Sequence, residues 1–549
     1  MRCWCYFRPA RGLAYEKKGE YDRAIRDYNK AIELNPDDAE VSQAGSLCYQ
    51  WETYHRLEAC ATNGKPITGW KPVLPNPVLP NPVLPKPVPP MEKRRWIEMA
   101  ELTVLDGAKS LSGTKILFED LEADTRLIFD FGINFNTVHK FLGKNFMDEV
   151  SDKTFEDKFK LYRSVNILPE VKLDNFYYPH IINSKKEFEA ISEPFVDGII
   201  LSHAHYDCQG HIKYLNPKIP LYASPETIAF YRQMQIRDWK SSCEEEPFYA
   251  GNNEKYRQMI PIYHKEEIIF GNGKKRFKVI PHYVDYSIPG AMGFLLITSN
   301  GKHIVYAGGV GAPPDGAQWS YTIDFSQFLA EYKPIDLLII DCTNIDKVDE
   351  EPEYIKQIFT LKRKIAREIK ASYDKNRMPI VCASGNNLPV IERVYQIAVE
   401  MGKKLCVPVY VANLLVKLKE SGAYEEKESI VNNLEDLIIY QRCIFEFKDR
   451  FSHLEKRYKN LQVVEYNFFN EKGRKNQENC ILLLWERDIM ELNSIKVKEG
   501  SYFIHCHWEP FCEEFNFPPD KLANWMEMLK LNYVSIPITG HMYREQRSP

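Results

Sequence analysis

The sequence predicts an α/β protein built in two parts and preceded by a short α-helical hairpin. Two patterns support this prediction. Residues 93–346 contain strand-like runs that follow one another through turns, whereas in residues 347–497 strands alternate with amphipathic helices. A hydrophobic fraction of 44% with 27% charged residues in a chain of 549 residues is ordinary for a folded multi-domain protein and excludes wholesale disorder.

Residues 1–68 are expected to form the helical hairpin. Gly12, Ala24 and Ala31 are small residues at helical spacing that let two helices approach closely, and Pro36 ends the second helix. The segment resembles one tetratricopeptide repeat. Because about three repeats are needed to bury a continuous core, a leftover hairpin is the simpler interpretation. Binding of a protein partner through it remains open.

Residues 69–92 are expected to be a linker. The unit Pro-Val-Leu-Pro-Asn recurs in tandem from residue 72, and proline at every second or third position forbids helix and sheet. An extended spacer between two domains is therefore the common meaning of such a segment.

The main body opens at residue 93. Strands are predicted at residues 101–105, 115–118, 126–129, 196–201, 335–341 and 379–382, with a hairpin over 295–306 around Asn300-Gly301. Helices are predicted at residues 353–373 and 388–401. From residue 498 to 549 the chain is expected to return to the first part, which spans residues 93–346.

Charge and cysteine usage narrow the class of protein. Lys and Arg number 72 against 76 Asp and Glu, a formal net charge of −4, which excludes binding of nucleic acid by bulk charge but not by a local basic groove. No apolar run is long enough to span a bilayer, and we expect no membrane partner. The N-terminus lacks the apolar core of a secretory signal, and the thirteen cysteines are scattered, so we expect reduced thiols and a cytoplasmic location.

The segment Ser-His-Ala-His-Tyr-Asp-Cys-Gln-Gly-His, residues 202–211, points to metal chemistry. His203 and His205 lie two residues apart at the end of a predicted strand and project to the same side, which suits chelation of one zinc-like ion. Carboxylate and thiolate also bind zinc. The expected metal ligands are therefore His203, His205, Asp207 and Cys208.

This segment resembles the His-x-His-x-Asp-His signature of the metallo-β-lactamase-fold hydrolases, and further motifs match in order between residues 100 and 541. Asp130 matches the first motif, residues 284–291 the segment of the third histidine, and Asp341 the acidic motif after a later strand. Residues 384–387 and 539–541 resemble two further motifs of the ribonuclease J-like β-CASP branch. The resemblance implies a four-layer αββα metallo-β-lactamase fold with an inserted β-CASP-like α/β domain at 347–497.

The resemblance also implies a reaction. In that family two divalent ions, usually zinc, activate water for attack on a phosphodiester of RNA or single-stranded DNA. Carried over by position, His203 and His205 would hold the first ion and Asp207 the second. The implied catalytic residues are Asp207, Asp341 and His541.

Three positions depart from the family pattern. Cys208 stands at the fourth signature histidine, Tyr286 at the third-motif histidine, and Gly309 at the bridging aspartate. Glycine has no side chain to offer, so we expect at most one ion, most simply zinc. Spare donors for that ion are His211, His282 and Asp285. The family's last histidine does not follow His541, which suggests a truncated form of a longer family member.

Two functions therefore stay open. One is a ribonuclease J-like phosphodiester hydrolase with a depleted metal site and weak or absent activity. The other is a non-catalytic binding or scaffold protein that uses the cleft, the helical hairpin or the proline-rich segment. Simpler interpretations also stand for single residues: hydrogen-bonded polar side chains for His203 and His205, a buried apolar thiol for Cys208, a cap for Asp341 and an exposed ring for His541.

Overall fold

The computed structural model describes residues 100–108, 110, 112–142, 153–237, 253–271, 275–311, 320–340, 353–422, 427–441, 460–507 and 519–537. All of them belong to one compact unit of the chain. The expected helical hairpin, the proline-rich linker, Asp341 and His541 lie outside the described residues.

The first sheet has six strands in the order β1-β2-β3-β4-β5-β6. Its antiparallel half comprises β1 (Glu101–Asp106), β2 (Lys115–Asp120) and β3 (Thr125–Phe131). Its parallel half continues from β3 through β4 (Gly198–Ile200), β5 (Leu221–Ala223) and β6 (Met259–Pro261). The strands predicted between residues 101 and 201 are confirmed, although β4 begins two residues later than predicted.

The second sheet has five strands in the order β11-β10-β9-β8-β7. They are β7 (Ile268–Phe270), β8 (Phe277–Tyr283), β9 (Met292–Ile297), β10 (His303–Tyr306) and β11 (Leu337–Ile339). β9 and β10 pair antiparallel, which confirms the predicted hairpin. Gly301 in its turn has a φ of +80°, a conformation that glycine adopts without strain.

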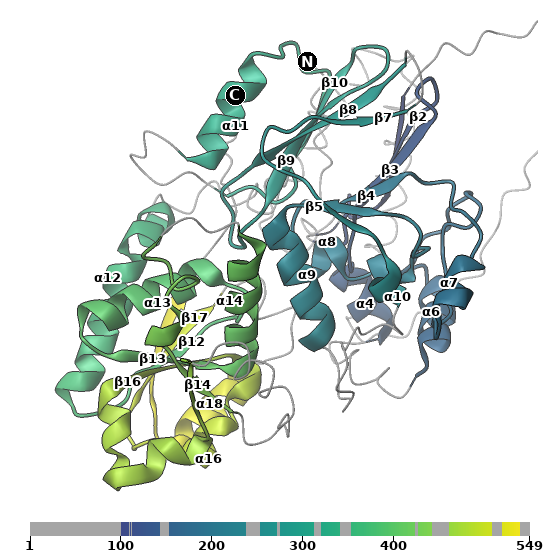
Figure 1. Cartoon of the computed structure of the whole chain (residues 1–549). Coiled ribbons are helices and arrows are strands. Elements are labelled where there is room, and N and C mark those ends of the chain that lie inside the picture. The colour runs from purple at the N-terminus through teal and green to yellow at the C-terminus, as the bar shows by residue number, and fades with distance from the viewer. Residues whose placement is uncertain are drawn as a thin grey trace, which may run out of the picture. The chain divides into compact units, whose positions relative to one another are not determined.

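The two sheets pack face to face because apolar residues alternate along their strands. On β2, Ile116 and Phe118 face the second sheet, while Leu117 faces the opposite way, toward helices. On β9, Phe294 joins the core between the sheets and Leu295 packs beneath a helix. Helices α4 (Phe135–Leu142), α6 (Phe155–Ser164) and α9 (Pro225–Arg237) cover the first sheet, and α11 (Tyr321–Ala330) covers the second (Figure 1). The predicted four-layer αββα fold is therefore confirmed.

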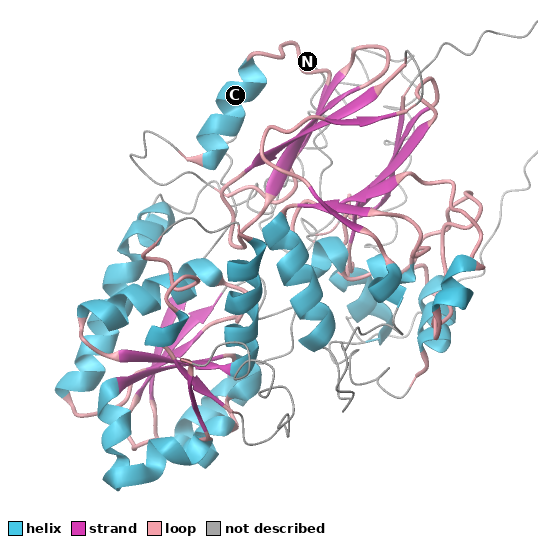
Figure 2. Ribbon diagram, viewed as in Figure 1, coloured by secondary structure: helices cyan, strands magenta, loops and turns pink. Residues whose placement is uncertain are grey.

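The third sheet has seven parallel strands in the order β15-β14-β13-β16-β12-β17-β18. They are β12 (Ile380–Cys382), β13 (Lys404–Pro408), β14 (Ile438–Tyr440), β15 (Gln462–Val464), β16 (Cys480–Leu484), β17 (Tyr502–His507) and β18 (Asn532–Pro537). One face packs on α12 (Glu353–Asp374), α13 (Leu388–Glu400) and α14 (Val409–Ser421), the other on α16 (Glu491–Ile495) and α18 (Pro519–Leu529) (Figure 2). Both predicted helices are confirmed.

The expected return to the core at residue 498 differs from the structure. β17 pairs in parallel with β12, and β18 pairs with β17, so both strands extend the third sheet. The physical reason is that Phe503 and Ile504 are apolar on successive positions and are buried on both faces, as in an interior parallel strand.

Except for η3, the remaining described elements are short. They are α7 (Lys185–Glu189), α8 (Tyr206–Gln209), α10 (Asn253–Tyr256), η1 (Ile212–Tyr214), η2 (Leu434–Asp436), η3 (Tyr466–Asn479) and η4 (Glu486–Asp488). Among the described helices, none has the length and apolar character needed to cross a bilayer.

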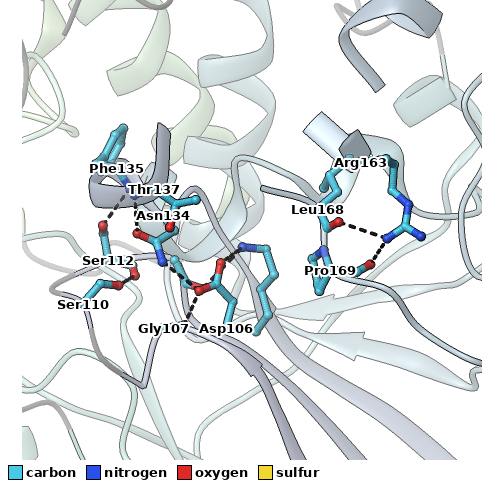
Figure 3. Close-up of polar contacts among 12 residues, drawn as sticks. Asp106, Gly107, Ser110, Ser112, Asn134, Phe135, Thr137, Arg163, Leu168 and Pro169 are labelled. Atoms are coloured by element: carbon cyan, nitrogen blue, oxygen red, sulfur yellow. Dashed lines mark hydrogen bonds and ion pairs between the residues drawn. The ribbon is translucent and has the colours of Figure 1, made fainter. Parts of the chain in front are cut away.

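A polar cluster joins β1, β2 and the start of α4 (Figure 3). The Asp106 carboxylate accepts from Lys115 Nζ at 2.8 Å and from Asn134 Nδ2 at 2.7 Å. Asn134 Oδ1 in turn accepts the backbone N–H of Thr137 in the first turn of α4. Burial lowers the pKa of Lys115, although Asp106 opposes that shift. This cluster orients the loops that flank the site described below.

Candidate functional site

Asp130, in β3, organises the segment that follows β4. Its carboxylate accepts the Ser202 backbone N–H at 2.7 Å and the Ser202 hydroxyl at 2.6 Å, and it also accepts from the Tyr306 hydroxyl and the Cys208 thiol. Burial raises the pKa of Asp130 to about 6, and the hydrogen bonds act in the opposite direction. Its φ of +52° is uncommon for a residue with a side chain. One buried carboxyl thus ties together the ends of three elements.

Gly132 allows α8 to lie directly against the end of β3. A Cβ at Gly132 would lie 1.6 Å from the carbonyl oxygen of Asp207. That carbonyl accepts the N–H of Gly113 at 3.1 Å, and the carbonyl of Tyr206 accepts the N–H of Ile133 at 2.9 Å. The backbone that carries Asp207 is therefore held by the loops before β2 and after β3.

His203, Asp207 and Cys208 offer ligand atoms that lie within 4.8 Å of one another. The Ser202 hydroxyl donates to Asp130, so its oxygen accepts from Nδ1–H of His203 at 3.0 Å. We assign the His203 tautomer with its lone pair on Nε2, the form that binds a metal. Burial raises the pKa of the Cys208 thiol well above its usual value, so an ion would have to displace the thiol proton.

His205 lies beside this group and is half-buried. Its ring centroid is 4.8 Å from that of His203, with the two rings nearly perpendicular. The ring of Tyr286 completes an aromatic trio, 4.8 Å from His203 and 5.5 Å from His205. The structure thus places all four predicted ligands at one site, but the group of converging ligand atoms comprises His203, Asp207 and Cys208.

Gly309, which follows β10, lies directly beneath Tyr286. A Cβ at this glycine would lie 2.7 Å from Cε1 and Cζ of Tyr286 and 3.0 Å from Cε1 of His203. Contacts this short do not occur between a Cβ and a ring, so any side chain at position 309 would collide with the present position of Tyr286. The tyrosine ring therefore takes up space that a longer side chain at position 309 would need.

The sequence matches two family models. Residues 184–362, which include the group of three ligands, match the beta-lactamase superfamily domain. The chain contains a metallo-β-lactamase-superfamily domain. Residues 10–38 match the tetratricopeptide repeat, so the predicted repeat is confirmed as a sequence family. No curated protein sequence matches the chain.

The chain is also similar to several solved structures. A protein of unknown function from Enterococcus faecalis V583 is 18% identical, with a TM-score of 0.56, over 81% of this chain and 89% of that one. A metallo-β-lactamase with a HARLDQ motif from Cronobacter sakazakii is 13% identical over 53% and 82% of the two chains, with a TM-score of 0.22. A metallo-β-lactamase from Staphylococcus aureus subsp. aureus COL is 11% identical over 70% and 99%, with a TM-score of 0.21. Only the first similarity is close enough to support the fold.

The donors in the superfamily domain fit one zinc-like ion. An imidazole nitrogen, a carboxylate oxygen and a thiol sulfur are all zinc ligands, and three protein ligands with a water make a common catalytic set. The spare donors predicted from the sequence lie elsewhere. His211 is buried against the rings of Tyr162 and Tyr214, and Asp285 accepts the N–H of Thr322 at the start of α11.

Residues 384–387 behave as a helix start. Asn387 is the N-cap of α13, and its Oδ1 accepts the N–H of Val390 at 3.3 Å. A Cβ at Gly385 would lie 2.4 Å from the ring of Tyr410, which packs over this turn. The capping interpretation accounts for these contacts.

In the described part of the chain, two further clusters of potential ligands correspond to no short motif in the sequence. Cys382, Glu486 and His505 converge at the carboxyl ends of β12, β16 and in β17. His505 Nε2 and Glu486 Oε1 are 2.6 Å apart. This is the length of a direct hydrogen bond and is shorter than the separation of two ligands of one ion. The second cluster contains His264, His282 and Asp324. The spacing of these three residues along the sequence does not predict the cluster, because sheet pairing and helix packing bring them together.

Proposed function

We propose that this protein is a metallo-β-lactamase-fold member of the nucleic-acid phosphodiester hydrolase type, related to ribonuclease J, whose metal site is depleted and whose hydrolytic activity is weak or absent. One observation carries the proposal. The ring of Tyr286 lies over Gly309 and against His203, where the family pattern has a histidine and a bridging carboxylate. A second ion would need both of those ligands, and this chain supplies neither.

A single ion is still compatible with the donors. His203 Nε2, Asp207 and Cys208 would hold it, with His205 beside them. When bound, such an ion polarises a phosphoryl oxygen and lowers the pKa of water. Asp130 orients this group indirectly. It accepts a hydrogen bond from the Ser202 hydroxyl, and that hydroxyl in turn fixes the ring of His203.

The substrate class follows from the family resemblance. We infer RNA or single-stranded DNA as the substrate of this site, with Asp341 and His541 as further catalytic residues at the phosphate or leaving group. We also propose that the ion is zinc and that the protein is cytoplasmic. Without a second ion the enzyme would lack one of the two positive charges that clamp the phosphate in two-metal hydrolases, and so its rate would be low.

The decisive experiment is elemental analysis for zinc and manganese on protein purified without chelator. The matched samples are a His203→Ala, His205→Ala double variant and a His180→Ala control, since the His180 ring is exposed. We expect the double variant to contain at most about one ion per chain fewer than the native protein and the control. An ion content that the double variant does not change would refute the metal site, and a loss of about two ions per chain in that variant would refute its depletion.

A non-catalytic binding role is the second candidate, and the tetratricopeptide match at residues 10–38 favours it. Such repeats commonly bind proteins. Hydrolysis of bis(4-nitrophenyl) phosphate and of 5′-phosphorylated RNA separates the two candidates. A slow hydrolysis that requires His203 supports the enzyme. Saturable RNA binding without any cleavage supports the scaffold.

A further inference from the structure

A second cluster of metal-binding side chains lies on the opposite face of the second sheet from the inter-sheet core. His282 is in β8, on the same face as Ile280, which packs with Phe325 of α11. Asp324 projects from α11, which packs on β8 (Figure 1). His264 comes from the connection between β6 and β7. Three elements distant in sequence thus supply a 2-His-1-carboxylate set.

The distances within this set match those between ligands of one ion. His282 Nε2 lies 3.2 Å from Asp324 Oδ2, and His264 Nε2 lies 3.5 Å from the same oxygen. Two ligand atoms at bond lengths near 2.1 Å and tetrahedral angles are separated by roughly 3.4 Å. All three ligand atoms lie within 4.8 Å of one another.

The protonation of His282 points to a cation. Its Nδ1 faces the carbonyl oxygen of Tyr283 at 2.9 Å, so Nδ1 carries the ring proton and donates it. When the ring is neutral, Nε2 therefore presents a lone pair, and this atom is buried and makes no hydrogen bond. A lone pair facing a carboxylate oxygen at 3.2 Å is repulsive unless a positive charge lies between them. A histidine held by a backbone carbonyl through Nδ1 is the usual arrangement of a metal ligand.

Two other groups bear on the site. Lys265 Nζ lies 2.9 Å from Asp324 Oδ2 and supplies a positive charge in this structure, but its side chain is 44% exposed and can move away. The N–H of Tyr283 donates to His264 Nδ1 at 3.1 Å, so His264 carries its proton on Nε2 here. His264 would have to exchange tautomer and release that hydrogen bond to bind an ion. His282 and Asp324 are therefore the principal ligands and His264 the third.

We propose that His282, Asp324 and His264 form a second divalent transition-metal site, distinct from the group around His203, that clamps α11 to β8. Two imidazoles and one carboxylate suit Zn²⁺, Co²⁺, Ni²⁺ or Cu²⁺ rather than Ca²⁺ or Mg²⁺. The helix it would clamp also binds Asp285 through Thr322, one residue before Tyr286. The ion would thus steady the turn that carries Tyr286.

The test is titration of the full chain with Co²⁺, followed by calorimetry and visible absorbance, in a His203→Ala, Cys208→Ala background that removes the first group. We expect about one Co²⁺ per chain to remain bound, and Asp324→Asn to weaken its binding by at least roughly tenfold. Lys265→Met should leave binding equal or tighter, because a competing positive charge is gone. Asp336→Asn is the matched control, since that carboxylate is held by Lys302 and a backbone N–H.

A background chain that binds no Co²⁺, or an Asp324→Asn variant that binds it equally well, would overturn the second site while leaving the proposed function untouched. Should the background fail to fold, the native chain provides the same test. Co²⁺ should then raise its melting temperature by more than it raises that of Asp324→Asn. Equal shifts in the two chains would count against the site.

Discussion

The ring of Tyr286 occupies the space where a side chain at Gly309 would begin: a Cβ on the glycine would lie 2.7 Å from two carbons of the ring. Each residue therefore depends on the other. The tyrosine ring can lie between His203 and the end of β10 only because position 309 has no side chain. This packing determines which side chain lies beside the ring of His203 in the candidate metal site.

We predict that Gly309→Ala destabilises the protein by about 1–3 kcal/mol, because the added methyl collides with Tyr286. In a Tyr286→Ala background the destabilisation by Gly309→Ala should be smaller by about 1 kcal/mol or more, because the ring is gone. Urea unfolding of the four chains measures this coupling. Gly301→Ala is a control in open space, where only the backbone strain of a φ of +80° is expected. Independent, additive effects of the two substitutions would contradict the contact.

The paired variant Gly309→Asp, Tyr286→His introduces the two residue types that the resemblance to the ribonuclease J-like branch implies at these positions. We expect its zinc content to rise above that of the native chain, because the carboxylate gains the space vacated by the ring and both new groups are zinc ligands. Elemental analysis against Gly309→Asp alone provides the comparison. No gain in the paired variant would mean that some other feature limits the number of ions.

Gly132→Ala is predicted to cost about 3 kcal/mol or more, since its methyl would overlap the carbonyl of Asp207. The damage should also reduce metal content, because α8 carries Asp207 and Cys208. Gly402→Ala is a matched control. That glycine has a φ of +62° and open space around it, so only backbone strain of about 1 kcal/mol is expected. Equal losses of stability in the two variants would contradict the close approach of Gly132 to the Asp207 carbonyl.

His211 should make the protein sensitive to acid. Burial lowers the pKa of its ring well below the usual value of 6.5, so between those two values the unfolded chain binds more protons than the folded one. Stability is then fully present above pH 6.5 and falls as the pH drops toward the folded-state pKa, by up to about 1.4 kcal/mol per pH unit. Unfolding of His211→Gln between pH 5 and 7 should show a shallower slope, whereas His180→Gln should retain the native slope.

Arg257 is expected to be the most costly single polar side chain to remove from the first sheet region. It is buried beside Glu254 and donates to the carbonyls of Asn216, Ile219, Ile212 and Leu215. Arg257→Met leaves the buried Glu254 carboxylate without this ion-pair partner and should lower the free energy of unfolding by about 3–5 kcal/mol. Arg126→Met removes a more exposed ion pair and should cost roughly 0–1 kcal/mol. Similar losses in thermal unfolding would show that burial does not matter here.

Local patterns predicted most of the secondary structure. Alternation in residues 115–118 and 126–129 identified two strands of the first sheet, and Asn300-Gly301 identified the hairpin of the second. The periodic helices at 353–373 and 388–401 were also correct, because their apolar faces are long and regular. The exception was the stretch from residue 498. A strand pattern reveals that a strand is buried but not which sheet it joins.

The candidate site was predictable in part. His203, Asp207 and Cys208 lie within six residues of one another at a strand end, so their convergence is a local property of the chain. The assembly of His264, His282 and Asp324 is different, because it depends on the pairing of β8 in its sheet and on the packing of α11. The spacing of these residues along the sequence does not predict that packing.

The sequence by itself determined the alternating strands, the helices and the short run of ligands, since each depends on neighbours a few residues away. Only the tertiary structure decided that Tyr286 covers Gly309, that Asp130 holds Ser202, and that His282 faces Asp324. Those relationships join residues between 23 and 72 positions apart. They arise from how sheets and helices pack, and that packing is set by the shape of the whole core rather than by any local pattern.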